Sequence, residues 1–488
     1  MSLRQKTLYG LTWSFIDQIA NLGITFIVGI TLARILSPRE FGLIGMITIF
    51  IAVSYTFVNG GFTQALIRKK NCTDTDYSTV FYFNLLISIV FFILLYIFSP
   101  AISSFFKEPE LMLILQVLGS LLMIDALGLI QRTILIKNIN FKLQAKISLI
   151  SSLCSGVIAI VMAYKGFGIW SLVAQRISRQ LIKTLLLWTW NRWIPALQFS
   201  KESFKELFGF GSKLLVSGLI DTIYQQIYLL VIGKFFSAQE LGYYTRADQF
   251  KNLPSQNLNG IINQVTYPVL SSIQDDIPRL RNSYKKLIRS TMFITFVLML
   301  GMAAIAEPMI ITLIGEKWRS SILLLQMLSC VGMFYPLQAL NLNMLKVQGR
   351  SDLFLKLEII KKLLAIPTII VGIFWGIKIM IVGMFVNTLI AYYLNSYWSG
   401  RMIGYSILEQ LRDIIPSFLL AMAMAITVYY IGTFVRLRPI WTLIIQILTG
   451  ATFTIIISEI IKMRDYLFLK EIALEKLSTY RIKKNEKI

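Results

Sequence analysis

Long apolar runs separated by short polar segments dominate this chain of 488 residues. Runs such as 85–98, 291–305 and 418–431, extended by their flanks, reach the roughly 20 residues that a helix needs to cross the hydrocarbon core of a bilayer. The pattern predicts an all-α polytopic membrane protein, because a backbone in lipid must satisfy its hydrogen bonds within the segment. We expect about fourteen transmembrane helices, at residues 8–34, 41–66, 78–101, 111–133, 145–165, 168–190, 208–234, 244–270, 288–312, 320–345, 355–377, 379–401, 413–435 and 438–462.

Polar positions next to these runs repeat along the chain. The segment Leu36–Gly42 is echoed 200 residues later by Phe236–Gly242, and Asn59, Gly60 and Gln64 are echoed by Asn259, Gly260 and Gln264. An even number of expected spans lies between corresponding helices, so both halves share one orientation. The sequence therefore predicts parallel repeats, and transporters built from two like halves commonly bind substrate where the halves meet.

The expected architecture follows from this repeat. It comprises a six-helix N-terminal lobe (1–195), a six-helix C-terminal lobe (200–405), two appended transmembrane helices (410–462) and a basic tail (463–488). Basic and apolar residues alternate in the tail. This pattern fits an amphipathic helix on the anionic inner leaflet or a solvated tail.

The large net charge of this chain reflects its membrane topology. The formal net charge is +23, yet most of the basic residues fall in every second connection and in the tail. Fewer fall on the other side, among them Arg34, Lys107, Lys165 and Arg319. This asymmetry is the positive-inside rule, so the charge sets topology, both termini are expected in the cytoplasm, and no nucleic-acid partner is expected.

Composition excludes several chemistries. Apolar residues make up 56% of the chain, histidine is absent, and the three cysteines lack metal-ligand spacing. His-based nucleophile activation, His-ligated zinc and His proton relays are therefore excluded, and we expect no cofactor, no metal and no enzymatic activity. The outer connections are too short to fold as a catalytic domain.

A basic stripe lies at membrane depth in the expected span 168–190. Arg176, Arg179 and Lys183 follow Gln175 at spacings that place them along one helical face. Guanidinium groups donate paired hydrogen bonds to phosphate or carboxylate, so the stripe suits a phosphorylated or acidic cargo. Snorkelling to headgroups is the alternative; it fits Lys183 well and Arg179, near the middle of the span, poorly.

Acidic residues also fall inside expected spans. Asp17 and Asp221 are candidates for coupling to a proton or cation, because a buried carboxylate responds strongly to its surroundings. Structural pairing with the basic stripe is the alternative for both. Asp125 lies toward the inner end of its span and is interpreted as structural.

Amides form a second set of candidate cavity residues. Asn59, Gln64, Asn259 and Gln264 join Gln175 as groups that can hydrogen-bond sugars. Amides also hold membrane helices together at about 1 kcal/mol each, which is a sufficient reason for many of them. The glycines beside Asn59 and Asn259 favour helix bends at these places.

Several ordered motifs resemble one family of transporters. They include Leu32–Pro38 with Glu40–Gly42, Ala65–Lys69, Gly166–Gln175, Leu241–Tyr244, Gln274–Asp276 and Gly315–Trp318. The set is similar to the polysaccharide transporter family, Wzx-like oligosaccharide flippases of the multidrug/oligosaccharidyl-lipid/polysaccharide exporter superfamily. The chain departs from the pattern at Tyr228, where relatives often carry an acidic residue shortly before a Gly-basic pair.

The resemblance implies a flippase of the bacterial inner (plasma) membrane. It would translocate undecaprenyl-pyrophosphate-linked oligosaccharide repeat units from the cytoplasmic to the outer face by alternating access, for surface polysaccharide biosynthesis. The implied partners are this lipid-linked substrate, membrane lipids, and a polymerase with other assembly proteins. Two alternatives stay open: a multidrug or small-molecule cation antiporter of the same fold, and a membrane enzyme of the polysaccharide pathway.

Overall fold

The computed structural model describes residues 3–435 and 437–485, except the side chains of 3–8, 11, 256–259, 261, 263–265, 473 and 476–485. Its residues divide into two compact units, Met1–Gly242 and Tyr243–Ile488. The described residues form helices joined by short connections, with no strand among them. The expected all-α fold is therefore confirmed.

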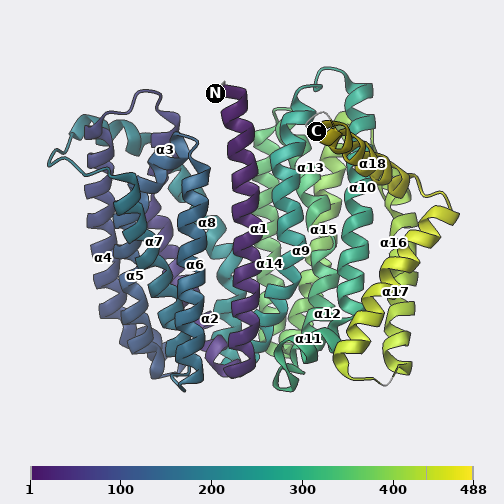
Figure 1. Ribbon diagram of the computed structural model, residues 1–488, viewed down its shortest axis with the longest axis horizontal. Helices are drawn as coiled ribbons and strands as arrows, with labels where there is room; N and C mark the ends of the chain where they lie inside the picture. The colour runs from purple at the N-terminus through teal and green to yellow at the C-terminus, as the bar shows by residue number, and fades with distance from the viewer. Residues whose placement is uncertain (1–2, 436, 486–488) are drawn as a thin grey trace. The chain divides into compact units, whose positions relative to one another are not determined.

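The first unit contains eight complete helices. They are α1 (Leu3–Ile35), α2 (Pro38–Asn59), α3 (Phe62–Arg68), α4 (Asp74–Phe106), α5 (Glu110–Lys137), α6 (Phe141–Tyr164), α7 (Trp170–Asn191) and α8 (Lys201–Phe235). Helix α6 packs against α1 and α7, α5 packs against α4 and α7, and α8 packs against α2, as Figure 1 shows. Helix α7 is thus held between α5 and α6.

Helix α9 (Ala238–Ser271) begins in the first unit and continues into the second. The second unit continues with α10 (Ile277–Ala304), α11 (Ala306–Ile314), the 3₁₀ turn η1 (Glu316–Trp318), α12 (Ser321–Gly332), α13 (Tyr335–Val347), α14 (Ser351–Trp375), α15 (Ile377–Ile403), α16 (Ile407–Phe434), α17 (Pro439–Ile460) and α18 (Arg464–Asn485). Its main core lies where α10 meets α13, α15 and α16, around Tyr284, Phe296 and Tyr405.

Eleven helices in the described part of the chain are long and apolar enough to cross a membrane, and this makes the chain a multi-pass membrane protein. The fourteen expected spans all fall on helical segments, although spans 41–66, 288–312 and 320–345 each cover two consecutive helices. Helices α7, α9 and α14 are not among the eleven. Charge is the reason for α7, which carries Arg176, Arg179 and Lys183, and for α14, which carries Lys356, Glu358, Lys361 and Lys362. Helix α9 is instead low in hydropathy, because its first half is charged and its second half is rich in Asn, Gln and Ser. The count of fourteen spans stays a prediction.

The helix boundaries follow the sequence repeat. Helices α1 and α8 end at Ile35 and Phe235, and α2 and α9 begin at Pro38 and Ala238. Both second helices begin with the same cap, in which Glu40 accepts from the Ser37 backbone N–H at 2.5 Å and Glu240 accepts from that of Ser237 at 3.0 Å. The repeated residues therefore form the same local structure in both copies.

The helix after each cap behaves differently farther along. Helix α2 ends at Asn59, because Gly60 and Gly61 adopt left-handed φ angles of 48° and 72° before α3 begins. Helix α9 continues through Gly260 without a break. The expected interruption is thus found beside Asn59, whereas the backbone beside Asn259 remains helical.

The tail forms a helix and is anchored at its first turn. The buried Asp465 carboxylate accepts from Arg289 Nε of α10 at 2.7 Å and from Ser417 Oγ of α16 at 2.9 Å. Helix α18 also packs against α10 and α17. A fully solvated tail is therefore wrong for its beginning.

Candidate substrate-binding site on α7

Helix α7 has two unlike faces. Leu181 and Leu185 are exposed, as expected for side chains in contact with acyl chains, while the predicted site residues Gln175, Arg176, Arg179 and Lys183 are half-buried. The helix is fixed along α5 by Thr184 Oγ1, which donates to the Ile124 carbonyl at 2.9 Å, and by Trp188 Nε1, which donates to that of Leu127 at 2.8 Å. These bonds set the rotation of α7 and turn its basic stripe toward the protein.

Arg179 joins a polar network between three helices. Its Nη2 donates to Asn21 Oδ1 of α1 at 3.5 Å, and Ser152 Oγ of α6 donates to the same oxygen at 2.6 Å. Asn21 Nδ2 in turn donates to Ser148 Oγ of α6 at 2.8 Å and to the carboxylate of Asp17. The network holds the guanidinium half-buried against α1 and α6, and its cavity-lining role stays a prediction.

Asp17 therefore belongs to the same group as Arg179, although Asn21 stands between their charges. The candidate coupling carboxylate and the leading cationic residue are linked through one amide. A change in the charge of Asp17 would be felt at Arg179 through Asn21, so the arrangement keeps Asp17 as a coupling candidate.

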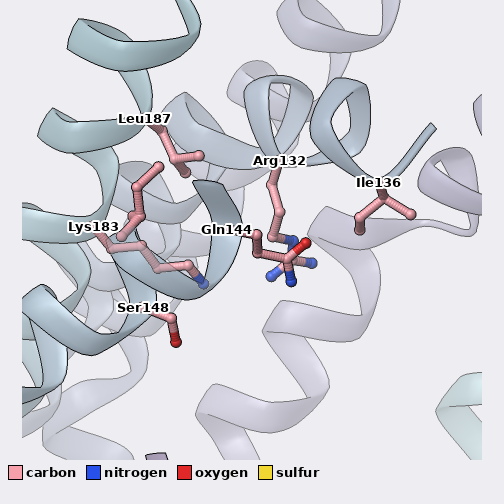
Figure 2. A pocket seen from close by; sticks show the side chains of 7 residues that line it. Arg132, Ile136, Gln144, Ser148, Lys183 and Leu187 are labelled. Carbon is pink, nitrogen blue, oxygen red and sulfur yellow. The ribbon is translucent and has the colours of Figure 1, made fainter. Parts of the chain in front are cut away.

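Arg176 and Lys183 lie on either side of Arg179 along the stripe. Neither forms an ion pair with a carboxylate in the described part of the chain. Lys183 has no hydrogen bond to Asn21 but lines a pocket with Arg132 of α5 (Figure 2). Ser148, which accepts from Asn21, lines the same pocket, so Arg179 and Lys183 face two adjoining places.

Asp125 behaves as expected for a structural carboxylate. It is buried in α5 and accepts from Gln180 Nε2 of α7 at 2.7 Å. This bond adds to those of Thr184 and Trp188 in fixing α7 against α5.

The remaining predicted residues lie elsewhere. Asn59 donates from Nδ2 to the Tyr55 carbonyl of its own helix at 3.0 Å, so its amide caps the end of α2. Gln64 is exposed on α3, and Asp221 is exposed on α8, beside Thr222, whose hydroxyl is 3.0 Å from that of Thr56. The side chains of Asn259 and Gln264 lie outside the described residues.

Sequence reasoning missed three residues that the structure brings to α7. In the sequence, Arg132 lies at the inner edge of the expected span 111–133, among the basic residues of the expected cytoplasmic side, and nothing singles out Gln144 or Ser148 of α6. Helix α5 extends to Lys137, so Arg132 lies five residues inside its end, and only the structure shows this depth.

Comparison with known proteins identifies a family for this chain. The model of a family described as "Polysaccharide biosynthesis protein" matches residues 31–323, which include α7. The lipopolysaccharide biosynthesis protein WzxC of Escherichia coli K12 is 28% identical over 378 residues, covering 76% of each chain. The teichuronic acid biosynthesis protein TuaB of Bacillus subtilis 168 is 26% identical over 354 residues, covering 72% of this chain and 73% of TuaB.

The fold is also found in a solved structure. The lipid II flippase MurJ, in an inward closed conformation, superposes with a TM-score of 0.74 at 18% identity, covering 94% of this chain and 100% of that chain. At this identity the likeness concerns the fold. The resemblance drawn from the motifs is confirmed, and because the matched residues span more than half of its length, the chain belongs to the polysaccharide biosynthesis protein family.

Proposed function

We propose that this protein is a flippase that moves undecaprenyl-pyrophosphate-linked oligosaccharide repeat units from the cytoplasmic to the outer face of the plasma membrane. The observation that carries the proposal is the half-buried basic stripe of α7 in a multi-pass chain of this family. An ionised side chain at membrane depth costs roughly 2.5–3.5 kcal/mol on insertion scales, so such groups are usually retained for a function.

The pyrophosphate is the part of the cargo that this stripe suits. Arg179 and Arg176 would attract it, because guanidinium groups donate paired, charge-assisted hydrogen bonds to phosphate oxygens. The prenyl chain stays in lipid, and alternating access then exposes the sugar on the outer side. The sequence holds no G-x-x-x-x-G-K-[ST] loop for ATP phosphates, so the proposed mechanism uses no ATP of its own.

The names of the similar proteins support this assignment. One is named for teichuronic acid biosynthesis and another for lipopolysaccharide biosynthesis, and the structural neighbour is a lipid II flippase. Polymer precursors attached to lipid are the common theme of these names. The coupling ion, with Asp17 as the candidate carboxylate, is part of the proposal.

A cation antiporter on the same fold is the second candidate. A cavity for cationic cargo favours acidic linings, whereas the half-buried charges of α7 are Arg176, Arg179 and Lys183. No specific contact of the described residues favours this candidate over the flippase. Unchanged drug susceptibility in a deletion strain agrees with the first proposal.

The test is an Arg179→Ala variant expressed in a strain that lacks the chromosomal copy. We expect surface polymer to fall at least tenfold and lipid-linked repeat units to accumulate, because the phosphate loses its main ligand. Surface polymer is measured by immunoblot, and membrane insertion by the amount of protein in the membrane fraction.

Lys165→Ala is the matched control. It removes one positive charge from an exposed position before α7 and outside the stripe, so export should stay normal. Wild-type polymer levels in the Arg179→Ala strain, at equal membrane content, would rule out the proposed role of the stripe.

A further inference from the structure

A small cationic pocket lies between α5, α6 and α7, at the ends of these helices that the charge asymmetry predicts to be cytoplasmic. Its volume is about 190 Å³, and its polar lining consists of Arg132, Gln144, Ser148 and Lys183. Figure 2 shows Arg132 and Lys183 reaching toward its centre from two different helices. Ile147 and Leu187, both buried, close its walls.

The two charges of this pocket have no carboxylate in direct contact among the described residues. Neither Arg132 nor Lys183 forms an ion pair with any carboxylate in the described ranges. Asp125 and Asp17 attract Lys183 from beyond ion-pair distance, while Asp125 accepts from Gln180 and Asp17 accepts from Asn21. Two like charges in one small, partly dry pocket are unfavourable, and a bound anion removes that cost.

The chemistry of the lining favours a phosphate group. Arg132 presents a planar fork of donors, and Lys183 adds a compact positive charge with three donors. The amide NH2 of Gln144 can donate to a phosphate oxygen, whereas its buried Oε1, which has no hydrogen-bond partner, is an acceptor and does not itself favour an anion. This combination suits the several oxygens of a phosphate better than it suits a halide.

The size of the pocket limits what it holds. Sites for whole small-molecule ligands usually measure about 300–1,000 Å³, so 190 Å³ fits an anionic group and not an oligosaccharide. The ligand must therefore extend out of the pocket, with its larger part elsewhere.

The depth of the pocket matches a lipid. Lys183 lies eight residues before the end of α7 and Arg132 five before the end of α5, which corresponds to roughly 12 and 8 Å along the helices. The polar headgroup layer is about 5–8 Å thick on each side, so the pocket lies near its inner boundary. A phosphate there can keep its acyl or prenyl chains in the bilayer.

We propose that Arg132, Lys183, Gln144 and Ser148 form a binding site for the phosphate group of a membrane lipid. The site adjoins the Asn21 network of Arg179, with which it shares Ser148, but does not include Arg176 or Arg179. Two lipids carry this chemistry: an anionic phospholipid of the inner leaflet, and the prenyl pyrophosphate of the cargo. In the second case the inference rests on the proposed function and makes the pocket a first contact that precedes transfer to Arg179.

The experiment uses the full chain in nanodiscs of phosphatidylcholine. Phosphatidylglycerol is added in one arm and undecaprenyl pyrophosphate in the other, and bound lipid is counted by native mass spectrometry. We expect saturable binding in at least one arm, weakened about tenfold or more by Arg132→Gln or Lys183→Gln. Lys183→Arg should retain binding, because it keeps the charge.

Lys146→Gln is the matched control, since it removes one charge from an exposed position of α6 near the pocket. Gln144→Leu keeps the charge and removes the amide, so it tests the pocket even where a charge variant fails to fold. Binding only of phosphatidylglycerol assigns the site to bilayer lipid, and binding of undecaprenyl pyrophosphate assigns it to cargo.

Two results would overturn the inference: no saturable lipid in either arm, or equal binding by wild type, Arg132→Gln and Lys183→Gln. Neither result would contradict the proposed flippase function, because that function is tested independently by surface polymer in the Arg179→Ala strain. Conversely, if the Arg179→Ala experiment contradicts the flippase function, binding of phosphatidylglycerol to the pocket can still be measured and interpreted.

Discussion

A single polar side chain, that of Asn21, positions Arg179 of α7. Asn21 bonds with residues of α1, α6 and α7 at once, and its two ends are shared between Asp17, Ser148, Ser152 and Arg179. An amide suits this position because it both donates and accepts, whereas a carboxylate or an ammonium group does only one. The charge of Arg179 is held in place by neutral groups, and this leaves most of its donors available to a ligand.

Replacing Asn21 tests this arrangement. Asn21→Ala should lower the free energy of unfolding by about 1–2 kcal/mol, since interhelical hydrogen bonds in membranes contribute up to this amount. Export should also fall, because Arg179 loses its positioning partner. The measurements are the midpoint of thermal unfolding and surface polymer.

Asn71→Ala, at an exposed position in the connection between α3 and α4, is the control and should change neither. An unchanged midpoint in Asn21→Ala would show that the network adds nothing to stability.

At the scale of elements, the two repeated helix starts pack against each other inside the first unit. A Cβ placed on Gly42 would lie 1.6 Å from the Ala238 carbonyl oxygen, and one on Gly242 would lie 1.9 Å from that of Pro38. Only glycine allows the two backbones to approach this closely. The glycine in each copy of the repeat therefore serves the contact with the other copy.

Alanine at either glycine should force these helix starts apart. Overpacking of a tight contact costs typically 1–3 kcal/mol, so Gly42→Ala and Gly242→Ala should each lower the thermal midpoint. Cross-linking between cysteines introduced at Arg39 and Gln239 should fall in the same variants. A chain without Cys72, Cys154 and Cys330 provides the background.

Gly23→Ala is the control in α1, where an added Cβ meets nothing within 4 Å. It should be neutral or slightly stabilising, because alanine is the better helix former. Equal midpoints and cross-linking yields in Gly42→Ala and wild type would contradict the close contact.

At the scale of the whole molecule, topology depends on helices that hydropathy alone does not identify. Because of its basic stripe, helix α7 is not apolar enough to be identified as a membrane-spanning helix. Its neighbours α5 and α6 are both identified as such. If α7 did not cross the membrane, every later helix would have the opposite orientation. Its charges are half-buried against the protein, which lowers the cost of holding them at membrane depth.

Cysteine labelling decides whether α7 crosses. In the same cysteine-free background, Lys165→Cys should react with an impermeant maleimide from outside, and Leu197→Cys only after permeabilisation. Both positions are exposed, on either side of α7. Labelling of both from one side would contradict the fourteen-span topology and the orientation drawn from the basic residues.

Patterns of neighbouring residues in the sequence predict much of this architecture. Apolar runs located the helices, because a membrane segment is defined by its own length and composition. The echo of Leu36–Gly42 by Phe236–Gly242 predicted a repeat, and the structure places a helix end and a helix cap at matching positions in both copies. The helical period placed Arg176, Arg179 and Lys183 on one face of α7.

The amino-acid sequence by itself thus determined the all-helical membrane fold, the repeat and the basic face of α7, since these depend on residues near one another in the chain. Only the tertiary structure decided that Asn21 meets Arg179, that Arg132 shares a pocket with Lys183, and that Gly42 fits against Ala238. These pairs are far apart in sequence and meet through helix packing. The period of one helix fixes which way a side chain faces, but not which side chain of another helix lies opposite.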